Sequence, residues 1–167
     1  MTAVADSSPL IALASISAFQ FLEILFGNIV IPESVHAEVV LQGLGRAGAP
    51  EVSAATWIAV RRVQDLQRVG ALQRQHRIRG GEAEAIVLSD ELGADWLLMD
   101  ERLGRQAAVA AGIEPGHIIG TLGVLLAAKE RGLIAEISGK IAELQDRGFR
   151  IDPALYRMVQ RQAGEAG

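Results

Sequence analysis

The first ten residues constrain the fold most, because they join a strand to a helix with almost no connecting loop. The apolar run 3–5 is followed at once by Asp6, and Pro9 opens a second apolar segment. Ser8 is expected to be the helix N-cap and Pro9 the first helical residue, where a missing N–H costs nothing. The pattern therefore predicts a strand that presents Asp6 at its carboxyl end. In an open parallel sheet, these strand ends form the crevice where ligands bind.

Strands and helices alternate along the rest of the chain. The predicted strands are residues 3–5, 29–31, 57–60 (at an edge of the sheet), 96–99 and 118–119. The predicted helices are residues 9–17, 18–26, 33–41, 64–75, 82–92, 102–111, 121–131, 133–146 and 153–162. Residues 43–50 carry three glycines and a proline, so we expect a mobile loop there. This alternation predicts an α/β fold, with a parallel sheet of about four to five strands flanked by helices.

The composition fits one domain spanning residues 1–167, with C-terminal helices at about 133–163 packed on it. Half of the residues are hydrophobic and only 4% are aromatic, so the core is built from Ala, Val, Ile and Leu. The absence of cysteine excludes disulfides and thiolate metal sites, and the three histidines have no metal-ligand spacing. There is neither a basic signal-peptide start nor an apolar run near the ~20 residues of a membrane span. We expect a cytoplasmic protein with no membrane partner.

The charge distribution is uneven. The net charge of −4 argues against tight nonspecific binding to nucleic acid. Residues 61–79, however, carry six arginines against the single acid Asp65. A solvated helix face is the simplest interpretation of this run, but it is also the only substantial basic patch available to a polyanion.

Four carboxylates are candidates for one shared site. Asp100 ends an apolar run as Asp6 does, so both are expected at strand ends. Glu82 follows two glycines in the first turn of a helix, and Glu38 lies six residues beyond Pro32, about 9 Å along its helix. Since helices in such a sheet begin near the strand ends, these acids are expected to meet.

Each acid also has an ordinary explanation, such as a helix cap or a surface charge. Glu84 is the rival of Glu82; two residues apart on a helix, the two point about 200° apart, and only one can face the crevice. We favour Glu82 because it is nearer the helix start. Glu101 is the corresponding rival of Asp100.

Carboxylates without His or Cys partners make an oxygen-only site, which selects Mg²⁺ or Mn²⁺. Clustered anions repel one another unless a cation neutralises them. Such an ion can polarise a phosphate and activate water. Ser7 is a further candidate ligand or a turn residue, and Thr121 a helix cap or a phosphate contact. Arg102 and Arg105 could hold a phosphate or pair with the acids.

The chain resembles the PIN-domain ribonucleases, and more closely a prokaryotic PIN-like subfamily often found beside small antitoxin genes. The matching stretches are Asp6-Ser7-Ser8-Pro9-Leu10-Ile11, residues 25–32, Gly81-Glu82-Ala83-Glu84-Ala85-Ile86, residues 94–100, residues 120–126 and Gly148-Phe149-Arg150-Ile151.

The resemblance implies a PIN-like three-layer sandwich in which Asp6, Glu38, Glu82 and Asp100 bind Mg²⁺ or Mn²⁺ and cut RNA. It also implies a relative of the VapC-type toxins, held inactive by a small antitoxin protein and often a homodimer. Two departures stand out. The mid-chain acid is usually an aspartate, and the usual Thr-x-Asp is Leu98-Met99-Asp100 here, so the role of that threonine either passes to Thr121 or is lost.

Three hypotheses are consistent with these features. The first is a metal-dependent endoribonuclease, the toxin of a toxin–antitoxin pair. The second is a PIN-like module that binds RNA or protein without cutting. The third is a receiver-type phosphoacceptor with Asp6 and Asp100 around Mg²⁺ and Thr121 and Lys129 as switch residues; the helix-borne glutamates make it the weakest.

Overall fold

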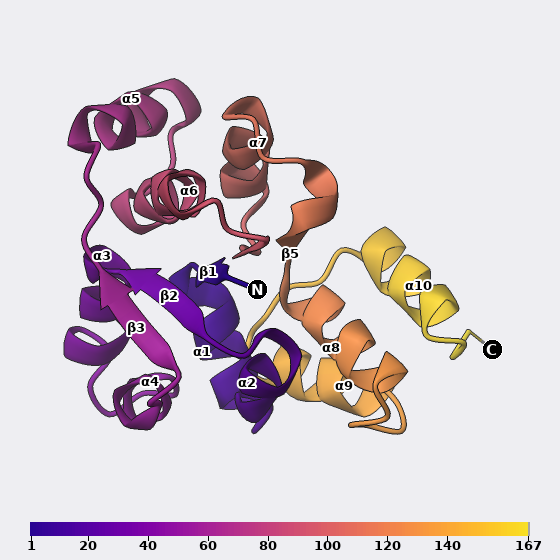
Figure 1. Ribbon diagram of the computed structural model, residues 1–167. Coiled ribbons are helices and arrows are strands. Elements are labelled where there is room, and N and C mark those ends of the chain that lie inside the picture. Colours follow the sequence, from indigo (N-terminus) through magenta and orange to yellow (C-terminus); the bar gives the residue numbers. More distant parts are fainter. Residues whose placement is uncertain (167) are drawn as a thin grey trace.

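The computed structural model describes residues 1–166, in which five strands form one parallel sheet with the order β3-β2-β1-β4-β5 (Figure 1). The strands are β1 (Ala3–Ala5), β2 (Ile29–Pro32), β3 (Ile58–Arg61), β4 (Trp96–Leu98) and β5 (Ile118–Ile119). The central strand β1 pairs with β2 on one side and β4 on the other. The predicted α/β fold, with its parallel sheet of four to five strands and β3 at an edge, is confirmed.

Helices cover both faces of the sheet and make three layers (Figure 1). One face carries α5 (Leu66–His76), α6 (Gly80–Leu92) and α7 (Arg102–Ala110). The other carries α1 (Ser7–Ser15), α2 (Gln20–Phe26), α8 (Thr121–Glu130), α9 (Ser138–Asp146) and α10 (Pro153–Gln162). The shorter elements are α3 (Glu33–His36), the π-helix η1 (Ala37–Leu41), α4 (Ala49–Ala54) and the 3-10 turn η2 (Pro115–His117).

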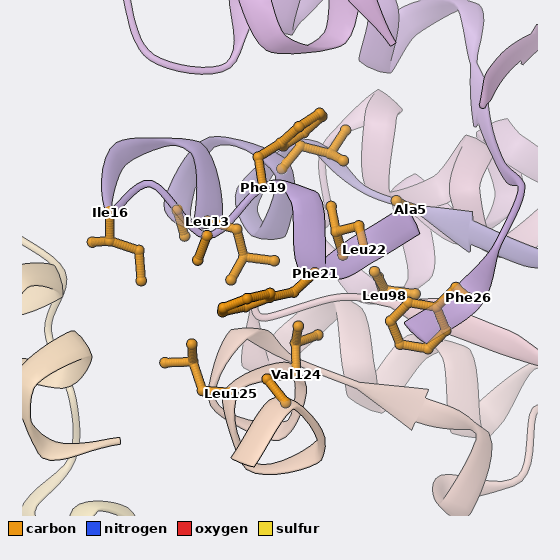
Figure 2. Close-up of a cluster of buried hydrophobic side chains, with 14 of the residues drawn as sticks. Ala5, Leu13, Ile16, Phe19, Phe21, Leu22, Phe26, Leu98, Val124 and Leu125 are labelled. Carbon is orange, nitrogen blue, oxygen red and sulfur yellow. The ribbon is translucent and has the colours of Figure 1, made fainter. Parts of the chain in front are cut away.

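Alternating side chains of the central strands feed two hydrophobic cores. Ala3 and Ala5 belong to the core under α1, α2 and α8, while Val4 belongs to the core under α5, α6 and α7. In the first core, Phe21 of α2 lies beside Val124 and Leu125 of α8 (Figure 2). Because both faces of the sheet are buried, the carboxyl ends of β1 and β4 are held firmly in place.

Several predicted boundaries are wrong. Asp6 rather than Ser8 is the N-cap of α1, since its extended backbone (φ −81°, ψ 170°) passes directly into the helix at Ser7. Pro9 is therefore the third helical residue, still within the first turn, where no N–H is needed. The expected loop 43–50 ends in α4, whose start is fixed by a hydrogen bond from the Gly48 N–H to Glu51 Oε2 of 2.8 Å.

Two further helices also differ from their predictions. The helix expected over 133–146 begins only at Ser138, and that expected over 33–41 changes from α to π geometry at Ala37. No helix within residues 1–166 combines the length and the apolar character needed to cross a membrane.

Candidate active site

Asp6 lies at the carboxyl end of β1 and is almost completely buried, with 1% of the residue exposed. Its backbone N–H donates to the Leu98 carbonyl oxygen at 2.9 Å, so the sheet fixes its position. Its Oδ2 atom has no hydrogen-bond partner among the described residues. Burial, with the nearby charges of Glu82 and Glu38, raises the pKa of Asp6 to about 6 despite a hydrogen bond from the Ser7 backbone. The fold thus holds a carboxylate in a place that disfavours its charge.

Glu38 approaches Asp6 from the π-helix η1. The Ser7 hydroxyl donates to Glu38 Oε2 at 2.9 Å and lies 3.5 Å from Asp6 Oδ1. Ser7 therefore links two acids that are far apart in the sequence. A π-helix is a costly local geometry that is found mainly at functional sites.

Glu82 and Glu84 point to opposite sides of α6, as their spacing predicts. Glu82 is buried and close enough to Asp6 to raise its pKa. Glu84 instead accepts hydrogen bonds from the hydroxyl and backbone N–H of Ser34 on α3. We call Asp6, Glu38 and Glu82 the acid cluster; Glu84 lies outside it.

Two glycines leave space beside the acid cluster. A Cβ placed on Gly81 would lie 3.6 Å from Asp6 Oδ1 and 3.5 Å from Glu38 Oε2. A Cβ on Gly104 of α7 would lie 3.2 Å from Glu82 Oε2 and collide with Met99 Sδ at 2.6 Å. The glycines thus form a cradle around the carboxylate oxygens that side chains would fill.

Arg79 is the residue at this site that the sequence reasoning missed. Its Nε lies 3.3 Å from Glu82 Oε1 and its Nη1 lies 3.8 Å from Glu38 Oε1. In the sequence it was one of six arginines in the basic run. The available signal was its i,i+3 spacing to Glu82, which favours an ion pair across the start of a helix.

Asp100 lies at the same edge of the sheet, but it is held differently. Its Oδ1 and Oδ2 accept hydrogen bonds of 2.7 Å each from the Thr121 backbone N–H and hydroxyl. Asp100 therefore supplies an anion at the N-terminus of α8, a favourable position in the field of the helix dipole. Burial raises its pKa even though the Thr121 hydrogen bonds lower it. Within residues 1–166, no hydrogen bond joins Asp100 to the acid cluster, and none of the three acids is among the groups that shift its pKa.

A groove of about 1270 Å³ begins at Asp100 and Thr121 and runs between α7 and α10. Its lining includes Arg102, Arg105 and Arg150 among apolar side chains. Arg105 is anchored, because its Nη1 donates to the Met99 carbonyl oxygen at 3.0 Å. The groove thus combines positive charge with one of the two strand-end acids.

The acid cluster fits a hard cation in its chemistry. All its donors are oxygens, Asp6 Oδ2 lacks a partner, and Gly81 leaves room beside two of the acids. Within residues 1–166, however, no three His, Asp or Glu side chains converge closely enough to form a ready metal site. Binding of an ion would therefore require the carboxylates to move closer together.

Comparison with known proteins places the chain in a family. None of the curated proteins matches it. A family model described as a PIN domain matches residues 2–165, which is nearly the whole chain. PIN domains are generally nucleases, and the family supports a nuclease-type, hydrolytic function. With its parallel sheet and helices on both faces, this chain belongs to the PIN-domain family.

Proposed function

We propose that this protein is a divalent-metal-dependent endoribonuclease that hydrolyses RNA phosphodiester bonds. The observation that carries the proposal is the acid cluster, in which Asp6 Oδ2 is buried and has no hydrogen-bond partner among the described residues. A buried oxygen without a hydrogen-bond partner among residues 1–166 and an elevated pKa together support a functional role for this carboxylate. The family supports nuclease chemistry, and such clustered acids need a cation.

Asp6, Glu38, Glu82 and Asp100 are the residues proposed to hold Mg²⁺ or Mn²⁺. Such an ion, when bound, supplies Lewis-acid polarisation of the phosphate and a water of lowered pKa. Ser7 orients Glu38 through its 2.9 Å hydrogen bond, and Thr121 orients Asp100 through two. Arg102 and Arg105 line the groove that includes Asp100, and their proposed role is to bind backbone phosphates of the RNA.

Cleavage of a labelled RNA in the presence of Mn²⁺ or Mg²⁺ tests the proposal. We expect Asp6→Asn, Asp100→Asn and Glu82→Gln to lose about a hundredfold or more of the rate. Glu84→Gln, two residues along the same helix, is the matched control and should keep the parent rate. If the Asp6 and Asp100 variants, purified in the same way, cut as fast as the parent, the assigned site is wrong.

The biological setting we propose is the toxin of a toxin–antitoxin pair, acting on RNA in the cytoplasm. Its partners would be RNA, a small antitoxin protein and a second copy of the chain. The family resemblance supports this setting. Induced expression in a bacterial host should arrest growth, and Asp6→Asn should relieve the arrest.

The alternative is a PIN-like module that binds RNA or protein without cutting. Two observations favour it: Asp100 is fully engaged with Thr121, and the acid cluster already contains the cation of Arg79. Here RNA would bind in the groove, and neither ion would produce cleavage. The receiver hypothesis has less support, because Lys129 pairs with Glu165 at 2.8 Å rather than with either strand-end acid.

A further inference from the structure

Arg79 supplies the positive charge that the acid cluster has in this structure. Its guanidinium lies 3.3 Å from Glu82 and 3.8 Å from Glu38. Burial would lower the pKa of Arg79, but its hydrogen bond to Glu82 and the charges of Glu38 and Asp6 raise it. One arginine faces three carboxyl groups, so it offsets only part of their negative charge when all are ionised.

The position of Arg79 in the chain is unfavourable for helix stability. Arg79 is the N-cap of α6, and its side chain caps no backbone N–H group. Ser, Thr, Asp and Asn stabilise that position, whereas a cation there opposes the helix dipole. Its interactions with the acid cluster offset this cost.

The two members of the closer ion pair differ sharply in solvent exposure. The Glu82 side chain is 7% exposed, whereas that of Arg79 is 64% exposed. Arg79 can therefore turn into solvent without opening the hydrophobic core. This is the behaviour of an exchangeable counterion.

We propose that Arg79 is a built-in competitor of the divalent cation. In the metal-free protein it neutralises Glu38 and Glu82 and holds them apart, and it must leave them when an ion binds. This inference rests on the proposed function of the acid cluster. It adds that Arg79 lowers the affinity of the cluster for the divalent cation, so that a higher concentration of the ion is needed to fill the site.

Binding of Mn²⁺ alone, followed through the electron paramagnetic resonance signal of the free ion, tests the inference without any RNA. We expect Arg79→Gln to bind Mn²⁺ about tenfold more tightly than the parent. The variant lacks a positive charge that repels the ion and competes with it for the carboxylates. Arg79→Lys, which keeps the charge but lacks the planar fork, should fall between the two.

Arg77→Gln is the matched control, since Arg77 is exposed, lies two residues away and forms no ion pair within residues 1–166. It removes the same charge from the same region and should change Mn²⁺ affinity much less. Thermal unfolding in EDTA gives a second measurement: Arg79→Gln should melt at a lower temperature than Arg77→Gln, and Mn²⁺ should remove the difference.

The outcomes separate the two proposals. If neither the parent nor any variant binds Mn²⁺, the metal site and the competition are both wrong. Equal Mn²⁺ affinities in Arg79→Gln and Arg77→Gln overturn the competition and leave the metal site standing. Weaker binding in Arg79→Gln also overturns it, because Arg79 would then be ordering the acids for the ion.

Discussion

Glu165 and Asp6 are both enclosed by the fold, but their surroundings shift the pKa in opposite directions. Glu165 accepts hydrogen bonds from Lys129 Nζ, the Ile137 N–H, and the N–H and hydroxyl of Ser138, at 2.8 to 3.2 Å. Although desolvation raises its pKa, these contacts lower it to about 2. Asp6 is more deeply buried, and yet one of its carboxylate oxygens has no hydrogen-bond partner in the described part of the chain, and its pKa is raised to about 6.

The difference separates an acid whose contacts stabilise the fold from one whose burial opposes its charge. Glu165 joins the end of the chain to α8 and to the start of α9, so its bonds are used in folding. The Asp6 carboxylate is contacted only by Ser7 among the hydrogen bonds of residues 1–166, and burial makes its charge costly. A buried polar atom left unsatisfied in an otherwise well-bonded structure indicates a functional site.

The largest expected effect on stability comes from removing Glu165. Glu165→Ala leaves the Ile137 and Ser138 N–H groups and Lys129 without their acceptor, so we expect a loss of about 3 kcal/mol in the free energy of unfolding. Urea denaturation at neutral pH measures it. Glu143→Ala, which removes a half-exposed ion pair with Lys140, is the control and should cost well under about 1 kcal/mol.

The pH dependence sharpens the same comparison. Because the folded pKa of Glu165 lies below its ordinary value of 4.5, its contribution is complete above that pH and is lost as the pH falls towards 2. The difference in the free energy of unfolding between the parent and Glu165→Ala should therefore be constant above about pH 4.5 and shrink as the pH falls towards 2. A difference that stays constant down to pH 2 would show that the ionised carboxylate does not matter.

Asp6→Asn should raise the free energy of unfolding, whereas Glu165→Ala should lower it. The folded pKa of about 6 exceeds the ordinary 3.8, so ionising Asp6 destabilises the metal-free fold as the pH rises through this interval. At about 1.4 kcal/mol per pH unit, the variant should gain on the order of 2–3 kcal/mol at pH 7 in EDTA. Urea denaturation from pH 3.5 to about 7.5 should show that gain vanish at the acid end. A variant less stable than the parent at pH 7 would contradict the comparison.

The smallest effect concerns the space beside Gly81. Gly81→Ala would place a methyl group against Asp6 Oδ1 and Glu38 Oε2, so Mn²⁺ affinity should fall by about threefold to tenfold. Gly80→Ala, whose Cβ would meet only Gln73 Nε2 at 3.6 Å, is the matched control. Both changes should stabilise α6 slightly, because alanine favours helix more than glycine does. Equal Mn²⁺ affinity in the two variants would mean that the cradle is not used.

Much of the fold could be predicted from the sequence, because buried parallel strands leave an unmistakable apolar signature. The strand 3–5 and the run before Asp100 are short, rich in buried residues and end in acids, and the structure pairs them directly. The choice between Glu82 and Glu84 as the site residue stays a prediction; in the structure Glu82 lies near Asp6, and Glu84 accepts hydrogen bonds from Ser34. The metal-binding roles of these acids stay predictions.

The parts that the sequence did not reveal depend on tertiary contacts. The switch from α to π geometry at Ala37 leaves no mark in the hydrophobic period, because the buried residues Val35 and Val39 have the i,i+4 spacing of an ordinary α-helix. Asp6 replaced Ser8 as the N-cap because the strand passes into the helix without a turn. Arg79 looked like part of a solvated run, since nothing local shows that Glu38 lies opposite it.

The winding of η1 has a consequence for how this site can vary. A π-turn holds one residue more than the α-turn it replaces, and here that extra residue lies in the segment that carries Glu38. Deleting a single residue after Glu38 would rewind the segment and rotate the residues that follow by about 100°, which would move Val39 out of the first hydrophobic core. The π winding therefore couples the position of this carboxylate to the packing of the core, so the length of η1 is constrained from both sides.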